Sequence, residues 1–245
     1  MNSLKKIFDR DTWDEIFESI SKNRTRTIIT SIGVFWGIFI YIALAGSATG
    51  LENGFDDAFS GLSKNSMGVW VQRTSISHKG FEEGRYPVFK LNDVDYLKSR
   101  VPEIQYIAPG LQAGAFTGSH PLVVRGLKSD NFNVFGNFPV YAKISVINIF
   151  DGGRYINDDD IKYERKVAVI GEGTQERLFN VREDPIGKYI RINDVNFKVV
   201  GVTKFTEGSG FGSDSDITIP YTTFAKMYNR GDQFGFMFIS GYEYV

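Results

Sequence analysis

The 245-residue sequence lacks cysteine and contains only two histidines. Without cysteine there are no disulfides and no thiolate metal ligands. His78 and His120 stand far apart and outside any H-E-x-x-H spacing, so the sequence predicts no zinc site. A surplus of either charge is also lacking, because 28 Lys and Arg oppose 29 Asp and Glu. This balance excludes the strongly basic surface typical of nucleic-acid binders, so no nucleic-acid partner is expected.

Recognisable catalytic and cofactor motifs are absent as well. The stretch 171–174 (GEGT) lacks the lysine of a phosphate-binding loop, and 208–210 (GSG) does not form a G-x-S-x-G elbow. The acidic stretches 158–160 and 214–216 lack the Gly and distal Glu of a calcium loop, so we interpret them as solvated turns. We therefore expect no catalytic, cofactor-binding or metal-binding residues. A membrane-tethered hydrolase, one alternative, finds no nucleophile and base to support it.

What the sequence does contain is one long apolar run at residues 27–49, without a single charge. As an α-helix this run would measure about 35 Å, enough to cross a hydrocarbon core of roughly 30 Å. A cleavable signal peptide is the alternative, with 43–45 (ALA) as its cleavage site, but its apolar region would usually be only about 7–15 residues long. The charges that flank the run are basic before it and acidic after it: Lys22, Arg24 and Arg26, then Glu52, Asp56 and Asp57. This asymmetry predicts a cytoplasmic N-terminus and an exported domain after about residue 50.

The segment before the run, residues 1–26, has an amphipathic pattern. Residues 12–15 (TWDE) resemble a capping box, which predicts that a helix begins at Thr12. Its apolar positions recur at i, i+3, i+4 and i+7, and they are Trp13, Ile16, Phe17 and Ile20. We expect this face to lie in the cytoplasmic membrane interface. The alternative is that it packs on a cytosolic domain.

Small residues within the run predict a packing face. Gly33 and Gly37 are four residues apart, the spacing that lets a second membrane helix approach closely. Beyond the run an apolar stripe continues at helical spacing, through Leu51, Phe55, Phe59 and Leu62. The sequence therefore predicts that residues 27–62 form a transmembrane helix that continues as a stalk.

The remaining residues, 63–245, alternate between strand and helix patterns, which indicates an α+β class. The expected strands are 66–76, 105–116, 121–126, 140–146, 166–171, 188–192, 195–202, 216–220 and 233–241. The expected helices are 92–101 with Asn92 as its cap, 174–180 and 221–230, with a short turn or helix at 131–135. Residues 193–194 (ND) predict a two-residue hairpin turn. The Gly- and Ser-rich loop at 203–216 is a candidate partner contact.

Several of these stretches resemble segments of one family. They are 22–34 (KNRTRTIITSIGV), 152–155 (GGRY), 167–171 (VAVIG), 184–192 (DPIGKYIRI), 197–202 (FKVVGV) and the strand-to-helix step at 217–221. Their order and content resemble the first part of a MacB/FtsX-type ABC transporter permease. The resemblance covers nearly the whole chain.

The resemblance implies a bacterial inner-membrane subunit, usually dimeric, that works with a cytoplasmic ABC ATPase and a periplasmic partner or cargo. It also implies a periplasmic region in two parts, Porter-like (about 63–136 plus 221–245) and Sabre-like (about 137–220). The sequence shows neither a fused ATPase nor the three further spans of the family, so we expect a separate ATPase and a chain that is a fragment or truncated. The alternative is a single-span periplasmic binding or assembly module without an ATPase.

Overall fold

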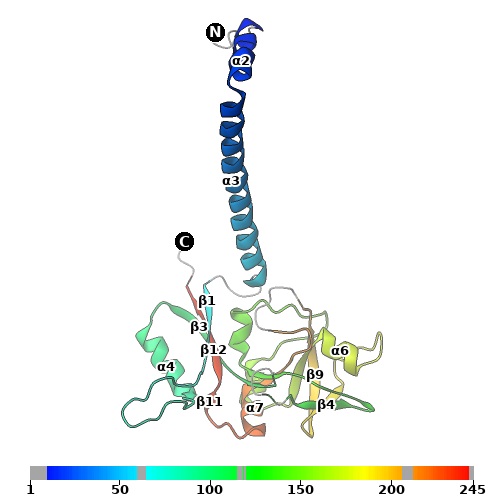
Figure 1. Cartoon of the computed structure of the whole chain (residues 1–245). Helices are drawn as coiled ribbons and strands as arrows, with labels where there is room; N and C mark the ends of the chain where they lie inside the picture. The colour runs from blue at the N-terminus through cyan, green and yellow to red at the C-terminus, as the bar shows by residue number, and fades with distance from the viewer. Residues whose placement is uncertain (1–9, 60–64, 115–117, 119, 206–211, 243–245) are drawn as a thin grey trace. The chain divides into compact units, whose positions relative to one another are not determined.

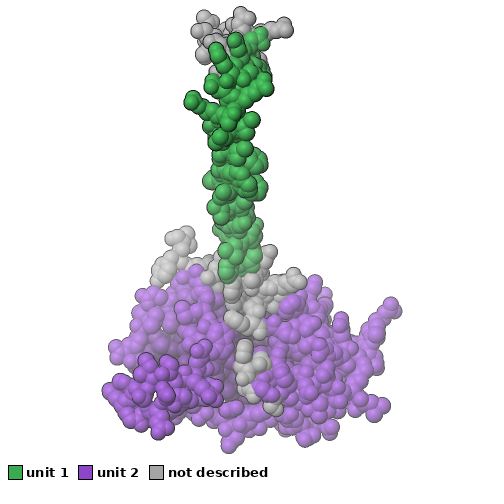
Figure 2. Space-filling model, viewed as in Figure 1, with its two compact units in different colours: residues 1–55 green, residues 56–245 purple. Residues whose placement is uncertain are grey.

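The computed structural model describes residues 10–59, 65–114, 118, 120–205 and 212–242. The chain divides into two compact units, residues 1–55 and 56–245, which Figure 2 colours separately. Leu62 and the 208–210 motif lie outside the described residues.

The first unit is helical. Helix α2 (Arg10–Lys22) is followed after one residue by α3 (Arg24–Phe59), which is 36 residues long. The predicted cap at Thr12 is wrong, because the chain is already helical at Arg10 and Thr12 lies inside the helix.

The second unit is built on one ten-stranded mixed sheet (Figure 1). In spatial order its strands are β1 (Ser66–Trp70), β12 (Phe236–Gly241), β3 (Ile104–Ala113), β6 (Val134–Asn137), β10 (Ile217–Pro220), β7 (Val167–Gly171), β9 (Val195–Thr203), β8 (Tyr189–Ile192), β4 (Leu122–Arg125) and β5 (Lys128–Asn131). The pairs β6–β10 and β7–β9 are parallel, whereas the other pairings in the sheet are antiparallel. A small second sheet pairs β2 (Phe89–Lys90) with β11 (Gln233–Phe234).

Short helices surround this sheet. They are α4 (Leu91–Arg100), η1 (Pro139–Lys143), α5 (Asp158–Lys162), α6 (Glu172–Leu178) and α7 (Tyr221–Met227). Within the domain, α4 and α6 lie at opposite ends of the sheet (Figure 1). The fold is therefore mixed α/β with one N-terminal apolar helix, as the sequence predicts.

Side chains alternate between the two faces of the sheet, because successive strand residues point in opposite directions. On β12, Met237 and Ile239 join the larger hydrophobic core, whereas Phe236 and Phe238 join a smaller cluster with Ile144. The larger core includes apolar residues of α4, α6 and α7. The smaller cluster includes partly buried residues of η1. The two faces of the sheet thus have separate cores.

Several local predictions are confirmed. The strand at 166–171 and the hairpin at 188–202 form as β7 and as β8 with β9. Asn193 and Asp194 take φ values of 40° and 65°, the left-handed conformations that a tight hairpin turn of type I′ requires.

Other local predictions are wrong. The alternation at 140–146 does not form a strand, because Pro139 fixes φ at the first position of η1 and starts a 3-10 turn instead. The range 131–135, expected as a turn or helix, holds the last residue of β5, a two-residue connection and the start of β6. The first strand stops at Trp70 rather than continuing to residue 76. Helix α4 begins at Leu91, with Lys90 rather than Asn92 as its cap, because the Asp93 side chain accepts from the Lys90 backbone N–H.

The two acidic stretches are not solvated turns throughout. The Asn157 side chain caps α5 by accepting from the Asp160 N–H, and the Asp160 carboxylate accepts from the Asn157 N–H. The Asp160 side chain is completely buried. Ser215 is also buried, and the Thr174 hydroxyl donates to its carbonyl. Local capping and long-range contacts therefore override the polar composition of these stretches.

Candidate functional site

The longest candidate element is the apolar part of α3. Residues Arg24–Phe55 have a mean hydropathy of 2.2 in their most apolar window, and none of that window is buried within the structure. By length and composition the helix could cross a membrane. Its large side chains are exposed on every side, including Phe35, Trp36 and Ile42. Water is a poor solvent for such a surface, so the helix needs lipid or other helices around it.

Gly33 and Gly37 lie within this exposed stretch. A Cβ atom added at either position would meet nothing within 4 Å. The glycines are therefore not required by contacts inside the described chain, and the surface that they form is open to a second helix.

On α2 the predicted interface residues share one exposed face. Trp13, Ile16, Phe17 and Ile20 are 48%, 43%, 62% and 40% exposed. The Trp13 and Phe17 rings lie 6.4 Å apart, as expected for positions one helical turn apart. An exposed aromatic and aliphatic stripe of this kind fits a membrane interface.

The predicted stalk residues are only partly described. Leu51 and Phe55 are exposed at successive turns of α3, and Phe59 is its last residue. Leu62 lies outside the described part of the chain. The helix thus continues for two to three turns beyond the uncharged run.

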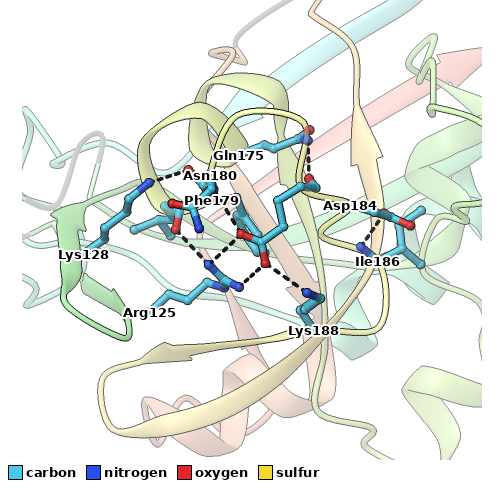
Figure 3. Close-up of polar contacts among 10 residues, drawn as sticks. Arg125, Lys128, Gln175, Phe179, Asn180, Asp184, Ile186 and Lys188 are labelled. Carbon is cyan, nitrogen blue, oxygen red and sulfur yellow. Dashed lines mark hydrogen bonds and ion pairs between the residues drawn. The ribbon is translucent and has the colours of Figure 1, made fainter.

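In the second unit, a polar cluster around Glu183 joins three segments. Figure 3 shows Arg125, Lys128 and Lys188 in this cluster. Arg125, at the end of β4, makes a bidentate pair with the Glu183 carboxylate, at 2.5 and 3.3 Å. Lys188 donates to the same carboxylate at 3.0 Å, and the Asn180 backbone N–H donates at 3.1 Å. These donors lower the pKa of Glu183 to about 2, with the Asn180 N–H the largest cause and Lys188 the next.

The same cluster satisfies carbonyls at the end of α6. Arg125 donates to the Leu178 carbonyl, Lys128 donates to the Phe179 carbonyl, and the Arg125 guanidinium lies 4.1 Å from the centre of the Phe179 ring. Cationic donors at a helix C-terminus are favourable. The cluster ties the β4–β5 hairpin to the segment after α6, which is a structural role. Sequence reasoning missed it, since Arg125 and Glu183 are 58 positions apart and no local pattern links them.

A second ion pair explains part of the 152–155 stretch. Arg154 pairs with the buried Asp160 at 2.5 and 3.0 Å, and Arg165 approaches the same carboxylate at 3.5 Å. Burial would raise the pKa of Asp160, but the Arg154 and Asn157 hydrogen bonds outweigh it and the net shift is downward.

Backbone packing accounts for two glycines of these stretches. The Arg154 N–H donates to the Val200 carbonyl, and a Cβ on Gly201 would lie 2.3 Å from the Arg154 carbonyl oxygen. A Cβ on Gly153 would lie 2.9 Å from the Gly201 Cα. Two backbones meet here at a distance that only glycine allows.

Among the described residues, no group of three or more His, Cys, Asp or Glu side chains is placed to hold a metal ion. The described residues thus form an apolar helix with no packing partner among them and a sheet domain with structural ion pairs. Together they define a class: a mixed α/β domain that follows one apolar helix long enough to span a membrane.

Comparison with known proteins assigns that class more closely. Residues 27–240 match the family described as the MacB-like periplasmic core domain, and the chain belongs to this family. A "Macrolide export ATP-binding/permease protein MacB" from Chlorobium phaeobacteroides is 27% identical over 85% of this chain. The "Pyoverdine export ATP-binding/permease protein PvdT" of Pseudomonas syringae pv. tomato is 30% identical over 82%.

These alignments cover 31% and 29% of the relatives, so the chain spans about a third of their length. Among solved structures, the periplasmic region of MacB from Actinobacillus actinomycetemcomitans matches with a TM-score of 0.59 at 22% identity, covering 76% of this chain and 79% of that one. The extracellular domain of the transporter YknZ from Gram-positive bacteria matches at 0.53 and 17%, over 64% and 74%. Both likenesses concern the fold.

Proposed function

We propose that this chain is part of the permease subunit of a MacB/FtsX-type ABC transporter. In this proposal α3 spans the inner membrane and residues 63–245 act in the periplasm. One observation carries the proposal: α3 exposes its apolar side chains around its whole circumference and continues unbroken to Phe59. A helix of this kind is stable in lipid and among other helices.

The orientation follows from charge. Lys22, Arg24 and Arg26 precede the apolar run, and basic residues are retained on the cytoplasmic side. The N-terminus and α2 are then cytoplasmic, with the exposed face of Trp13, Ile16, Phe17 and Ile20 in the inner leaflet.

The mechanism that fits is transmission of movement. An ABC ATPase on the cytoplasmic side changes shape as it binds and releases ATP. The helix from Arg24 to Phe59 has no proline and no break, so it carries a displacement along its length. The periplasmic domain then opens or closes on cargo or a periplasmic partner. The relatives' names, which join ATP-binding and permease functions, support this pairing.

The two-part division of the periplasmic region belongs to the same proposal. The Porter-like part would be 63–136 plus 221–245 and the Sabre-like part 137–220. The strand pairing refines it, since β4 pairs with β8 and so places the β4–β5 hairpin beside the second part.

Gly33→Leu combined with Gly37→Leu tests the helix-packing step. Neither side chain clashes inside the chain, so the domain stays folded, but the leucines block close approach of a second helix. We expect less co-purification of an ABC ATPase and of a second permease copy from detergent extracts. Ser31→Leu, on roughly the opposite side of the same helix, is the matched control and leaves co-purification unchanged. Equal recovery of partners from the double variant would show that Gly33 and Gly37 do not form the packing face. Failure of the unmodified chain to recover any ABC ATPase would instead favour a single-span module without an ATPase.

A further inference from the structure

A solvent-open cavity of about 120 Å³ lies on the sheet face that carries the smaller core. Strands β1, β12, β3, β6 and β10 contribute to its lining, together with η1 and the segment that follows η1. It lies wholly within the second unit. The ion-pair clusters of Arg125 and Arg154 are not part of its lining.

Aromatic rings form one side of the cavity. Trp70 and Phe238 meet edge to face at 5.7 Å, and Phe135 and Phe236 do so at 6.3 Å. Trp70 and Phe135 are only partly buried, so ring surface faces the cavity. Rings fixed in this way offer apolar area to a ligand with little loss of side-chain freedom.

A buried hydroxyl without a partner belongs to Tyr155, which also lines the cavity. Among the described residues, none makes a hydrogen bond to Tyr155 Oη, although that oxygen is buried. Asn137 and Thr218 lie close enough to lower the pKa of this hydroxyl, but neither meets the geometry of a hydrogen bond to it. Burial raises the pKa of Tyr155 well above its usual value, so the hydroxyl keeps its proton and can donate. A buried donor without an acceptor is costly, which favours a bound acceptor.

The charged groups of the cavity do not select a charged ligand. Asp216 already accepts from Asn133 Nδ2 at 3.0 Å and from the Ser213 N–H at 2.6 Å. Lys204 and Asp214 line the same cavity with opposite signs. A neutral ligand therefore avoids the desolvation of an unpaired charge.

We propose that this cavity binds a neutral amphipathic small molecule, whose ring system packs on Trp70, Phe135 and Phe236 and whose carbonyl oxygen accepts a hydrogen bond from Tyr155 Oη. The inference does not depend on the proposed membrane span or ATPase. It would stand if either of those failed.

The test uses the full chain in lipid nanodiscs, labelled with 5-fluorotryptophan and followed by ¹⁹F NMR. The chain has three tryptophans, Trp13, Trp36 and Trp70, and only Trp70 lines the cavity. The probes are 2-acetonaphthone and its isostere 2-isopropenylnaphthalene, in which C=CH₂ replaces C=O. Trp13 and Trp36 report partition into lipid, and Trp70→Phe assigns the resonance.

We expect a saturable shift of the Trp70 resonance with both probes and about fivefold tighter binding of the ketone. Tyr155→Phe should abolish that preference while the affinity for the alkene changes by less than about twofold. Phe135→Ala should weaken both probes, because it removes ring contact without touching the hydroxyl. An unchanged Trp70 resonance, or a ketone preference that persists in Tyr155→Phe, would overturn the proposal.

Discussion

The two units of this chain treat apolar side chains in opposite ways. In the sheet domain, Ile170, Phe197 and Ile217 are 0% exposed, whereas on α3 Phe35, Tyr41 and Leu44 are 63%, 74% and 66% exposed. The domain buries these apolar side chains within its own core, whereas α3 leaves its apolar side chains exposed. The difference teaches that the domain builds a core from its own residues, whereas among the described residues nothing covers the apolar part of α3. The same substitution should therefore have different effects in the two units.

The largest expected contrast is between two phenylalanines. Phe197→Ala removes a fully buried ring from the larger core and should lower the free energy of unfolding of the domain by about 3–5 kcal/mol. Phe39→Ala, on α3 where the ring is 52% exposed, should change it by less than about 0.5 kcal/mol. Urea unfolding of the full chain in detergent, followed by Trp70 fluorescence in a Trp13→Phe/Trp36→Phe background, measures both. Similar losses for the two variants would mean that α3 is part of the domain's core.

A glycine in the sheet gives the next effect. Gly201→Ala places a Cβ 2.3 Å from the Arg154 carbonyl oxygen, a backbone atom that cannot rotate away. Overpacking of this kind should cost about 1–3 kcal/mol, read from the urea midpoint. Gly235→Ala is the control, because a Cβ there meets nothing within 4 Å. If Gly201→Ala were as stable as the control, the close approach of the two backbones would be wrong.

The next prediction concerns how the stability contributed by Glu183 depends on pH. The pKa of Glu183 falls from 4.5 to about 2 on folding, so its stabilising effect is complete above about pH 4.5 and is lost as the pH falls toward 2. Glu183→Gln should therefore be less stable than the unmodified chain at pH 7, and the two should converge toward pH 2.

Urea midpoints at pH 7, 4 and 2.5 measure that convergence. Glu176→Gln, which changes an exposed residue of α6, is the matched control. A constant difference between Glu183→Gln and the unmodified chain at all three pH values would show that charge is not what Glu183 contributes.

Local and periodic features of this chain could be predicted from sequence. The 27–49 run, the buried strand at 167–171 and the hairpin turn at 193–194 each carry their signal in adjacent residues, and each forms. The strand expected at 140–146 failed where Pro139 outweighed alternation. The alternation of apolar residues is a weak predictor of a strand where a proline with a fixed φ angle starts a turn.

Features that depend on distant contacts could not be predicted. The Arg125–Glu183 pair and the aromatic cavity join residues from separate strands, and the burial of Asp160 depends on Arg154 and Arg165 as well as on its local cap. The acidic composition of the 158–160 stretch predicts a solvated turn. The sequence shows the carboxylates but does not show that the guanidinium groups of Arg154 and Arg165 pair with Asp160. The residues of α3 can be located from the sequence, but none of the described residues buries its most apolar window, so their neighbours cannot be.

The smallest effect concerns Gly54, near the end of α3. Gly54→Ala adds a Cβ that meets nothing within 4 Å, and alanine is favoured over glycine inside a helix by about 0.5–1 kcal/mol. If this part of α3 is an isolated helix, amide hydrogen exchange around residues 50–58 should slow by up to about fivefold in the full chain in detergent, as read by mass spectrometry. Gly235→Ala in the domain should leave exchange in that segment unchanged. Faster exchange in Gly54→Ala would mean that another surface packs against the glycine. The contrast between a self-sufficient domain and an open helix would then end before Gly54, and the stalk would belong with the packed part of the molecule.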